Sequence, residues 1–221
     1  MKKIISVLLV TFSFFSCSTT EKQKLPEIVK YNGETIPSVR EFVQSIEVIK
    51  LGHHDSITIG GQNFIQQRDS SFYIGDLQGT GLIYRFNRQG HFLNSIGKIG
   101  RGPGEYLMMC DFYVSDTANQ LYVLSNPFQL FLYDKQGHFI RQKESQTFAL
   151  SFTQKDDHFW LYAGFGIMPE GERVLCADSS LNIIRKCLPL ATKVSPITNE
   201  PAFTSWKNER YLTIALDPFF L

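Results

Sequence analysis

Residues 82–92 read LIYRFNRQGHF and residues 129–139 read QLFLYDKQGHF, so one pattern recurs after 47 residues. A matching apolar run lies upstream of each copy, FYIGD at 72–76 and LYVLS at 121–125, with an offset of 49. Runs of this length, rich in aromatic and branched residues and separated by turn residues, are typical of β-strands. Internal repetition of strand pairs therefore decides the fold.

The turn within each copy carries a glycine, Gly90 in the first and Gly137 in the second, where we expect a positive φ. A weaker third copy lies at 159–181, and a fourth begins near residue 209. A period in the forties with about four strands per repeat is typical of β-propeller blades. The sequence therefore predicts an all-β fold, a β-propeller of four-stranded blades with about three to four blades present.

The N-terminal segment has the layout of a secretory signal peptide. Two lysines precede an apolar run at 4–15, which is shorter than the roughly 20 residues that a membrane-spanning helix needs. The stretch FFSC at 14–17 resembles a bacterial lipobox, although its first position usually holds leucine. We predict that residues 1–16 are a lipoprotein signal peptide and that Cys17 is lipidated. An ordinary cleaved signal peptide is the alternative.

The chain turns polar after the apolar run, and residues 17–37 include two prolines. We predict that this stretch is a tether and that residues 38–221 form the β-propeller domain. Residues 38–46 are the single weak helical candidate within that domain. Everything after them follows the strand-and-turn pattern of the repeat.

Residues 95–106 read SIGKIGRGPGEY, and this stretch resembles the GPGEY signature of bacterial six-bladed β-propeller lipoproteins, distant relatives of NHL-type propellers. The resemblance includes the strand pairs on both sides of the motif and covers roughly residues 42–217. It implies a propeller fold and a place in the cell envelope, and it implies no reaction. Six blades need roughly 270 residues, whereas about 180 follow the tether, so we expect an incomplete, truncated six-bladed ring.

In a propeller, the loop between the second and third strands of a blade lies on the same face as the loop that leads to the next blade. Functional groups commonly gather on such loops. The loops expected on this face cover residues 76–81, 100–106, 125–129 and 165–172. The predicted ligand-binding residues on these loops are Asp76, Arg101, Glu105 and Asn126. A structural alternative is that Glu105 caps the amides of its own glycine-rich turn, with Arg101 in a surface pair.

Other reactive side chains are expected to be structural. His91 and His138 occupy equivalent turn positions and should be exposed to solvent. Cys110, Cys176 and Cys187 should be buried free thiols, because the spacing of the last two does not place them opposite each other in a hairpin. No zinc pattern, phosphate-binding loop or nucleophile–base motif is present in the sequence. We therefore predict no catalytic residue, no metal and no cofactor.

Charge excludes one class of partner. Lysine and arginine number 22 against 21 acidic residues, so the chain is nearly neutral and has no electrostatic footprint for nucleic acid. Contact with the membrane is expected through the lipid anchor alone. We predict an envelope-anchored scaffold, on the periplasmic side rather than the cell surface, that binds a small molecule, glycan or protein on its loop face without catalysis. The alternatives are a lyase, hydrolase or lactonase at the propeller mouth, and a nonfunctional truncated remnant.

Overall fold

The computed structural model describes residues 40, 43–52, 57–61, 63–117, 119–125, 129–145, 147–164, 172–189, 203–206 and 209–212. The chain divides into two compact units, Met1–Ile46 and Glu47–Leu221, and every strand belongs to the second unit. The predicted signal peptide and tether lie outside the described residues. Residues 43–46 of the weak helical candidate are not helical.

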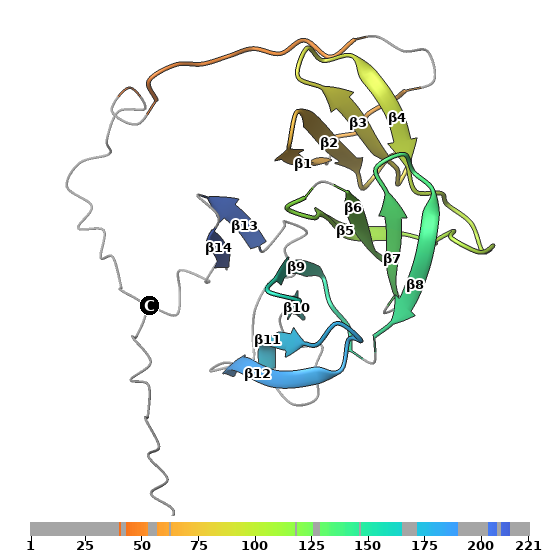
Figure 1. Ribbon diagram of the computed structural model, residues 1–221, viewed down its shortest axis with the longest axis vertical. Coiled ribbons are helices and arrows are strands. Elements are labelled where there is room, and N and C mark those ends of the chain that lie inside the picture. Colours follow the sequence, from red (N-terminus) through yellow and green to blue (C-terminus); the bar gives the residue numbers. More distant parts are fainter. Residues whose placement is uncertain are drawn as a thin grey trace, which may run out of the picture. The chain divides into compact units, whose positions relative to one another are not determined.

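The second unit contains three four-stranded antiparallel sheets and one two-stranded sheet, and strands that follow each other in the chain pair within each sheet (Figure 1). We call the three larger sheets blades 1, 2 and 3. Blade 1 contains β1 (Asn63–Arg68), β2 (Ser71–Asp76), β3 (Ile83–Asn87) and β4 (Phe92–Ile96). Blade 2 contains β5 (Met109–Val114), β6 (Gln120–Ser125), β7 (Gln129–Asp134) and β8 (Phe139–Glu144). Blade 3 contains β9 (Ser151–Lys155), β10 (His158–Tyr162), β11 (Glu172–Ala177) and β12 (Ile183–Pro189). The final hairpin contains β13 (Phe203–Trp206) and β14 (Glu209–Leu212).

The turn between the third and fourth strands is the same in all three blades. The side-chain Oδ1 of Asn87, Asp134 or Asp178 accepts hydrogen bonds from two backbone amides of its own turn, at 2.8–3.0 Å. The fourth residue of the turn has a positive φ, which is 82° at Gly90 and 94° at Gly137. The predicted equivalence of the two glycines is confirmed, and with it the all-β, blade-based fold.

The core lies between the blades. Each blade is too thin to bury both of its faces alone, so neighbouring blades pack their apolar faces together. Between blades 1 and 2 the largest fully buried side chains include Tyr73, Ile83, Ile96, Phe112 and Phe131. A second cluster joins blades 2 and 3, and the first strand of blade 2, β5, contacts both β1 and β9. The first strands of the blades therefore lie next to one another.

The structure also shows how the thiols are arranged and whether the turn histidines are exposed. Cys176 and Cys187 are free, and they lie on neighbouring strands without facing each other, since Cys176 pairs with Arg185. The expectation that they form no bridge is confirmed. Cys176 is buried as predicted, whereas Cys110 and Cys187 are half-buried. His91 and His138 are exposed on their turns, as predicted.

Candidate functional site

The predicted loop face brings two of its loops together. The buried hydroxyl of Tyr106, in the loop from blade 1 to blade 2, donates a hydrogen bond of 2.7 Å to the carbonyl of Gly81, in the loop between β2 and β3. Burial raises the pKa of Tyr106 above its ordinary value, so the hydroxyl stays a donor. These two loops are therefore neighbours, as the propeller geometry predicts.

Asp76 is wholly buried at the end of β2. Its carboxylate accepts hydrogen bonds from the backbone amides of Gly60 and Gly79 at 3.1 Å, and from the amide of Thr80 at 2.7 Å. The Thr80 hydroxyl adds a fourth bond of 3.1 Å. The side chain thus organises its own loop and the segment that precedes β1, and it presents no carboxylate oxygen to solvent.

Glu105 organises the glycine-rich loop in the same manner. Its carboxylate accepts a 2.9 Å hydrogen bond from the amide of Gly102 and pairs with the Lys98 ammonium at 2.6 Å. The hydrogen bond from Lys98, followed by the one from Gly102, lowers the pKa of the Glu105 carboxyl. Arg101 is exposed beside this turn, and Asn126 lies outside the described residues. The geometry matches the structural alternative for Glu105, with Lys98 as its ionic partner, and ligand binding by these residues stays a prediction.

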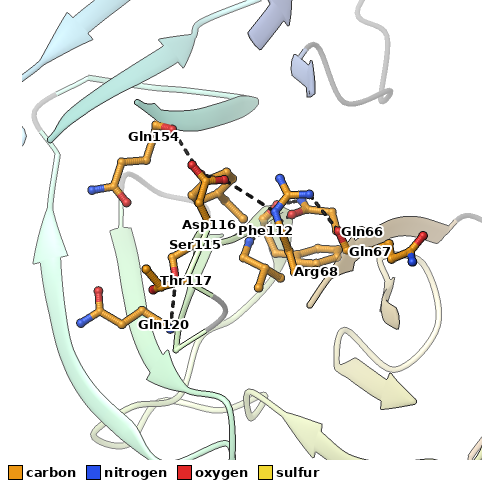
Figure 2. Close-up of polar contacts among 11 residues, drawn as sticks. Gln66, Gln67, Arg68, Phe112, Ser115, Asp116, Thr117, Gln120 and Gln154 are labelled. Carbon is orange, nitrogen blue, oxygen red and sulfur yellow. Dashed lines mark hydrogen bonds and ion pairs between the residues drawn. The ribbon is translucent and has the colours of Figure 1, made fainter. Parts of the chain in front are cut away.

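A second polar group lies at the opposite ends of the first strands. We call it the inner-strand polar cluster, and its members are Gln66, Arg68, Asp116 and Gln154, which Figure 2 labels, together with Tyr113. Strand β1 supplies the first two, β5 and the turn after it supply Tyr113 and Asp116, and β9 supplies Gln154. Three successive blades therefore each contribute polar groups to one connected cluster.

Gln66 joins blade 1 to blade 2 within this cluster. Its side-chain amide donates to the carbonyl of Phe112 at 2.5 Å and accepts from the amide of Val114 at 3.0 Å. The side chain thus satisfies two backbone groups of β5 that face blade 1. The pairing fixes the spacing between β1 and β5 and holds the cluster in place.

The charged members lie beyond Gln66. The Tyr113 hydroxyl lies 3.3 Å from a carboxylate oxygen of Asp116 and 3.2 Å from the backbone carbonyl of Gln154, and its one proton serves either acceptor. Arg68 Nε lies 3.8 Å from the same oxygen of Asp116, and its guanidinium carbon lies 6.0 Å from the Tyr113 ring centre. The Asp116 side chain is 68% exposed and that of Arg68 is 19% exposed. The cluster thus offers solvent a carboxylate beside a partly shielded guanidinium.

A buried carboxyl, Asp111, was not predicted from the sequence. It lies on β5 between blades 2 and 3 and accepts hydrogen bonds from the Ser151 hydroxyl at 2.6 Å and the Phe152 amide at 3.1 Å. The Phe112 amide adds a bond of 2.8 Å. Burial raises the pKa of Asp111 to about 7, against the opposing effect of these hydrogen bonds. The one available signal was a lone acid in the apolar strand MCDFYV.

Two further observations concern metal binding and membrane-spanning helices. Within the described ranges, no three His, Cys, Asp or Glu side chains gather as a metal site requires. The described residues also include no helix that is long and apolar enough to cross a membrane. The predictions of no metal and no cofactor remain predictions.

A family model described as a domain of unknown function, DUF4934, matches residues 27–218. The chain belongs to the DUF4934 family. The match begins inside the predicted tether and covers all three blades and the final hairpin. No curated protein matches this DUF4934 chain.

One of the solved structures that match the DUF4934 chain shares its fold with a TM-score above 0.5. A Bacteroides fragilis protein described as exported has 20% identity and a TM-score of 0.67, over 75% of this chain and 48% of that protein. The DUF4934 chain thus spans about half the length of that protein. A Bacteroides vulgatus member of the DUF4221 family has 15% identity and a TM-score of 0.43, over 55% of this chain and 41% of its own. The WD40 domain of Neurospora crassa Pan2 has 12% identity and a TM-score of 0.41, over 56% and 35%.

Proposed function

We propose that this DUF4934 protein is an exported binding scaffold without catalytic activity, and that the inner-strand polar cluster is its ligand contact. One observation supports this site above all. Arg68 of blade 1 and Asp116 of blade 2 form an ion pair, and the Tyr113 hydroxyl lies between Asp116 and the backbone carbonyl of Gln154 in blade 3, all at the same end of the first strands. A repeated scaffold that presents different polar side chains at one end is well suited to recognising a polar molecule.

The state of the acidic groups favours binding over catalysis. Among the described carboxyls, Asp111 has a pKa raised to about 7, the range that suits a general base. Its side chain is nevertheless sealed between two blades and occupied by three donors, so a substrate has no access to it. Asp116 is accessible, and its carboxylate lies 3.8 Å from Nε of Arg68, which is its ionic partner. The accessible groups therefore suit recognition.

The ligand chemistry follows from the two charged members. A guanidinium presents a fork of donors that suits a carboxylate, and a carboxylate next to it accepts hydrogen bonds from hydroxyl groups. An acidic sugar carries both groups, so among glycans, small molecules and protein segments we expect uronic-acid oligosaccharides to bind best. Neutral oligosaccharides of the same length should bind more weakly, because they carry no carboxylate for the Arg68 guanidinium to bind.

Calorimetric titration of oligogalacturonides and neutral gluco-oligosaccharides tests this proposal. We expect Arg68→Gln to weaken oligogalacturonide binding about tenfold or more. Arg88→Gln, on the exposed turn between β3 and β4, is the matched control and should leave affinity unchanged. Equal weakening by both variants would mean that the ligand binds elsewhere, or that only the net charge of the protein affects its affinity. Release of shortened oligosaccharides during incubation would instead establish the enzyme alternative.

We also propose that the protein reaches the cell envelope and is held there by lipid on Cys17. Support comes from the signal-peptide layout of residues 1–16 and from the structural neighbour described as exported. Cells fed an alkyne fatty acid should label the wild-type protein and not Cys17→Ser, and the wild type should sediment with membranes. Labelling that persists in Cys17→Ser, or an unlabelled protein in the soluble periplasmic fraction, would reject the anchor.

A further inference from the structure

The first strand of each blade carries one large apolar side chain at the same register position. Ile65 pairs with Ile74 in blade 1, Phe112 pairs with Val123 in blade 2, and Phe152 pairs with Leu161 in blade 3. In blades 2 and 3 this side chain belongs to the face that packs on the preceding blade. We call this face the first face of a blade.

The position is buried wherever a blade precedes it. Phe112 is fully buried, and its ring lies against Gly75 of blade 1, where an added Cβ would come within 2.6 Å of the ring. Phe152 is 2% exposed, and its ring centre lies 6.3 Å from that of Tyr113 in blade 2. Burial of such side chains stabilises a protein by roughly 1.5–3 kcal/mol each. Blade-to-blade packing through this position is therefore a repeated interface.

Blade 1 breaks the pattern, because Ile65 is 64% exposed. The outer part of its first face is covered by chain that precedes β1, since Leu51, Ile57 and Ile59 pack on Ile74 and its buried neighbours. The inner part, where Ile65 lies, has no such cover among the described residues. Exposed apolar surface at a repeated packing position indicates an interaction site.

Residues 47–52 reinforce this interpretation. The Gly90 turn of blade 1 rests on Lys50, and the amide of Gly52 donates to the Gly90 carbonyl at 2.8 Å. The Gly137 turn of blade 2 rests on Ser95 of β4 in the same way. Residues 47–52 thus occupy the place of an outer strand of a preceding blade, and Val48 in this segment is 88% exposed. Blade 1 is built to receive a blade on its first face.

We propose that the first face of blade 1, centred on Ile65 and Val48, is a docking surface for a second copy of this chain. The partner surface must be the trailing face of a four-stranded blade, because that is what covers Phe112 and Phe152 within the chain. Within this chain the trailing faces of blades 1 and 2 are covered by the next blade, so the surface that a second copy offers is the trailing face of blade 3, where Trp160 and Cys187 are only partly buried. The contact is head-to-tail, since unlike surfaces meet.

Analytical ultracentrifugation of the chain without its predicted signal peptide, with Cys17→Ser, tests the proposal. We expect the wild-type mass to rise from one copy towards two between about 1 and 100 μM. Ile65→Asp should raise the dissociation constant about tenfold or more, because it places a charge in an apolar contact. Val48→Asp should act in the same direction. Ile140→Asp is the matched control, since Ile140 is 48% exposed on β8, the outer strand of blade 2.

The variants change exposed side chains, so circular dichroism and the unfolding midpoint at low concentration should match those of the wild type. A wild type that stays a single copy across the whole range would overturn the proposal. Association that Ile65→Asp and Val48→Asp leave unchanged, or that Ile140→Asp weakens equally, would overturn it as well. Loss of association in both variants with the control intact would support it.

Discussion

Blades 1 and 2 have the same strand order and the same hydrogen-bonded turn, yet they differ at one equivalent position. Phe112 of blade 2 is fully buried, whereas Ile65 of blade 1 is 64% exposed. The difference arises from the neighbour, since blade 1 covers the first face of blade 2. Local sequence therefore specifies a blade, and packing between blades specifies how much stability each residue contributes.

The largest predicted effect compares these two positions directly. Phe112→Ala should lower the free energy of unfolding by about 3–5 kcal/mol, because it leaves a cavity between blades 1 and 2. Ile65→Ala should change it by less than about 0.5 kcal/mol in the single-copy state. Urea unfolding of both variants at about 1 μM measures the contrast without self-association. Similar losses would show that the first faces of the two blades are packed alike.

The next effect concerns the junction between blades 2 and 3, where Asp111 is buried. Its pKa is about 7 in the folded protein and lies near 3.8 when exposed. Between these values the folded state holds a proton that the unfolded state lacks, so lower pH favours folding. We expect the free energy of unfolding to fall by a few kcal/mol as pH rises from about 4 to 7, and to level off above that.

Asp111→Asn should remove this dependence, because the amide does not titrate. It should also lower stability at pH 4.5, since its NH₂ group cannot accept a bond from the Phe152 amide. Asp178→Asn is the matched control, because Asn87 makes the same turn in blade 1. The control should keep the wild-type slope between pH 4 and 7. A slope that survives in Asp111→Asn would assign the titration to another group.

The sequence predicted the parts of the fold that repeat locally. The Gly90 and Gly137 turns could be aligned by eye, and both have the expected positive φ. The third turn was harder to place, because Leu181 takes the same conformation at a φ of 67° without a glycine. Its signal is the residue three positions earlier, Asp178, whose side chain accepts the same bonds as Asn87. Side-chain hydrogen bonds, more than glycine alone, define this turn.

The sequence was less informative about the site, because the site depends on contacts between blades. Asp76 and Glu105 lie in the predicted loops, and the capping of its own glycine-rich turn by Glu105 was one of the two interpretations of the sequence. The bond from the Gly60 amide to Asp76 spans 16 residues, and no local pattern reveals it. The bonds from Asp111 to Ser151 and from Gln66 to Phe112 join residues 40 and 46 positions apart. Such pairs become visible only once the register of first strands in neighbouring blades is known.

The smallest predicted effect tests whether residues 47–52 serve blade 1 as β4 serves blade 2. Gly137→Ala should lower the free energy of unfolding by about 2 kcal/mol, since its φ of 94° disfavours a side chain and its Cβ would lie 2.8 Å from the Ser95 carbonyl oxygen. Gly90→Ala incurs a similar conformational cost. Its Cβ would come even closer to a backbone oxygen, that of Lys50, so the smaller loss is expected only if residues 47–52, which lie outside any strand, move away from the turn. We expect a loss of about 1 kcal/mol there in urea unfolding at about 1 μM.

Association should erase the difference between the two glycines. If a second copy packs against residues 47–52, it holds Lys50 in place as β4 holds Ser95. At about 100 μM the loss of unfolding free energy in Gly90→Ala should therefore approach the loss in Gly137→Ala. Asn87→Asp in the same turn is the control, because Asp134 already fills that role in blade 2. A concentration-independent gap between the two alanine variants would mean that residues 47–52 stay loose in every state. Residues 47–52 would then lie beside the Gly90 turn as β4 lies beside the Gly137 turn, but they would be held in place less firmly than β4.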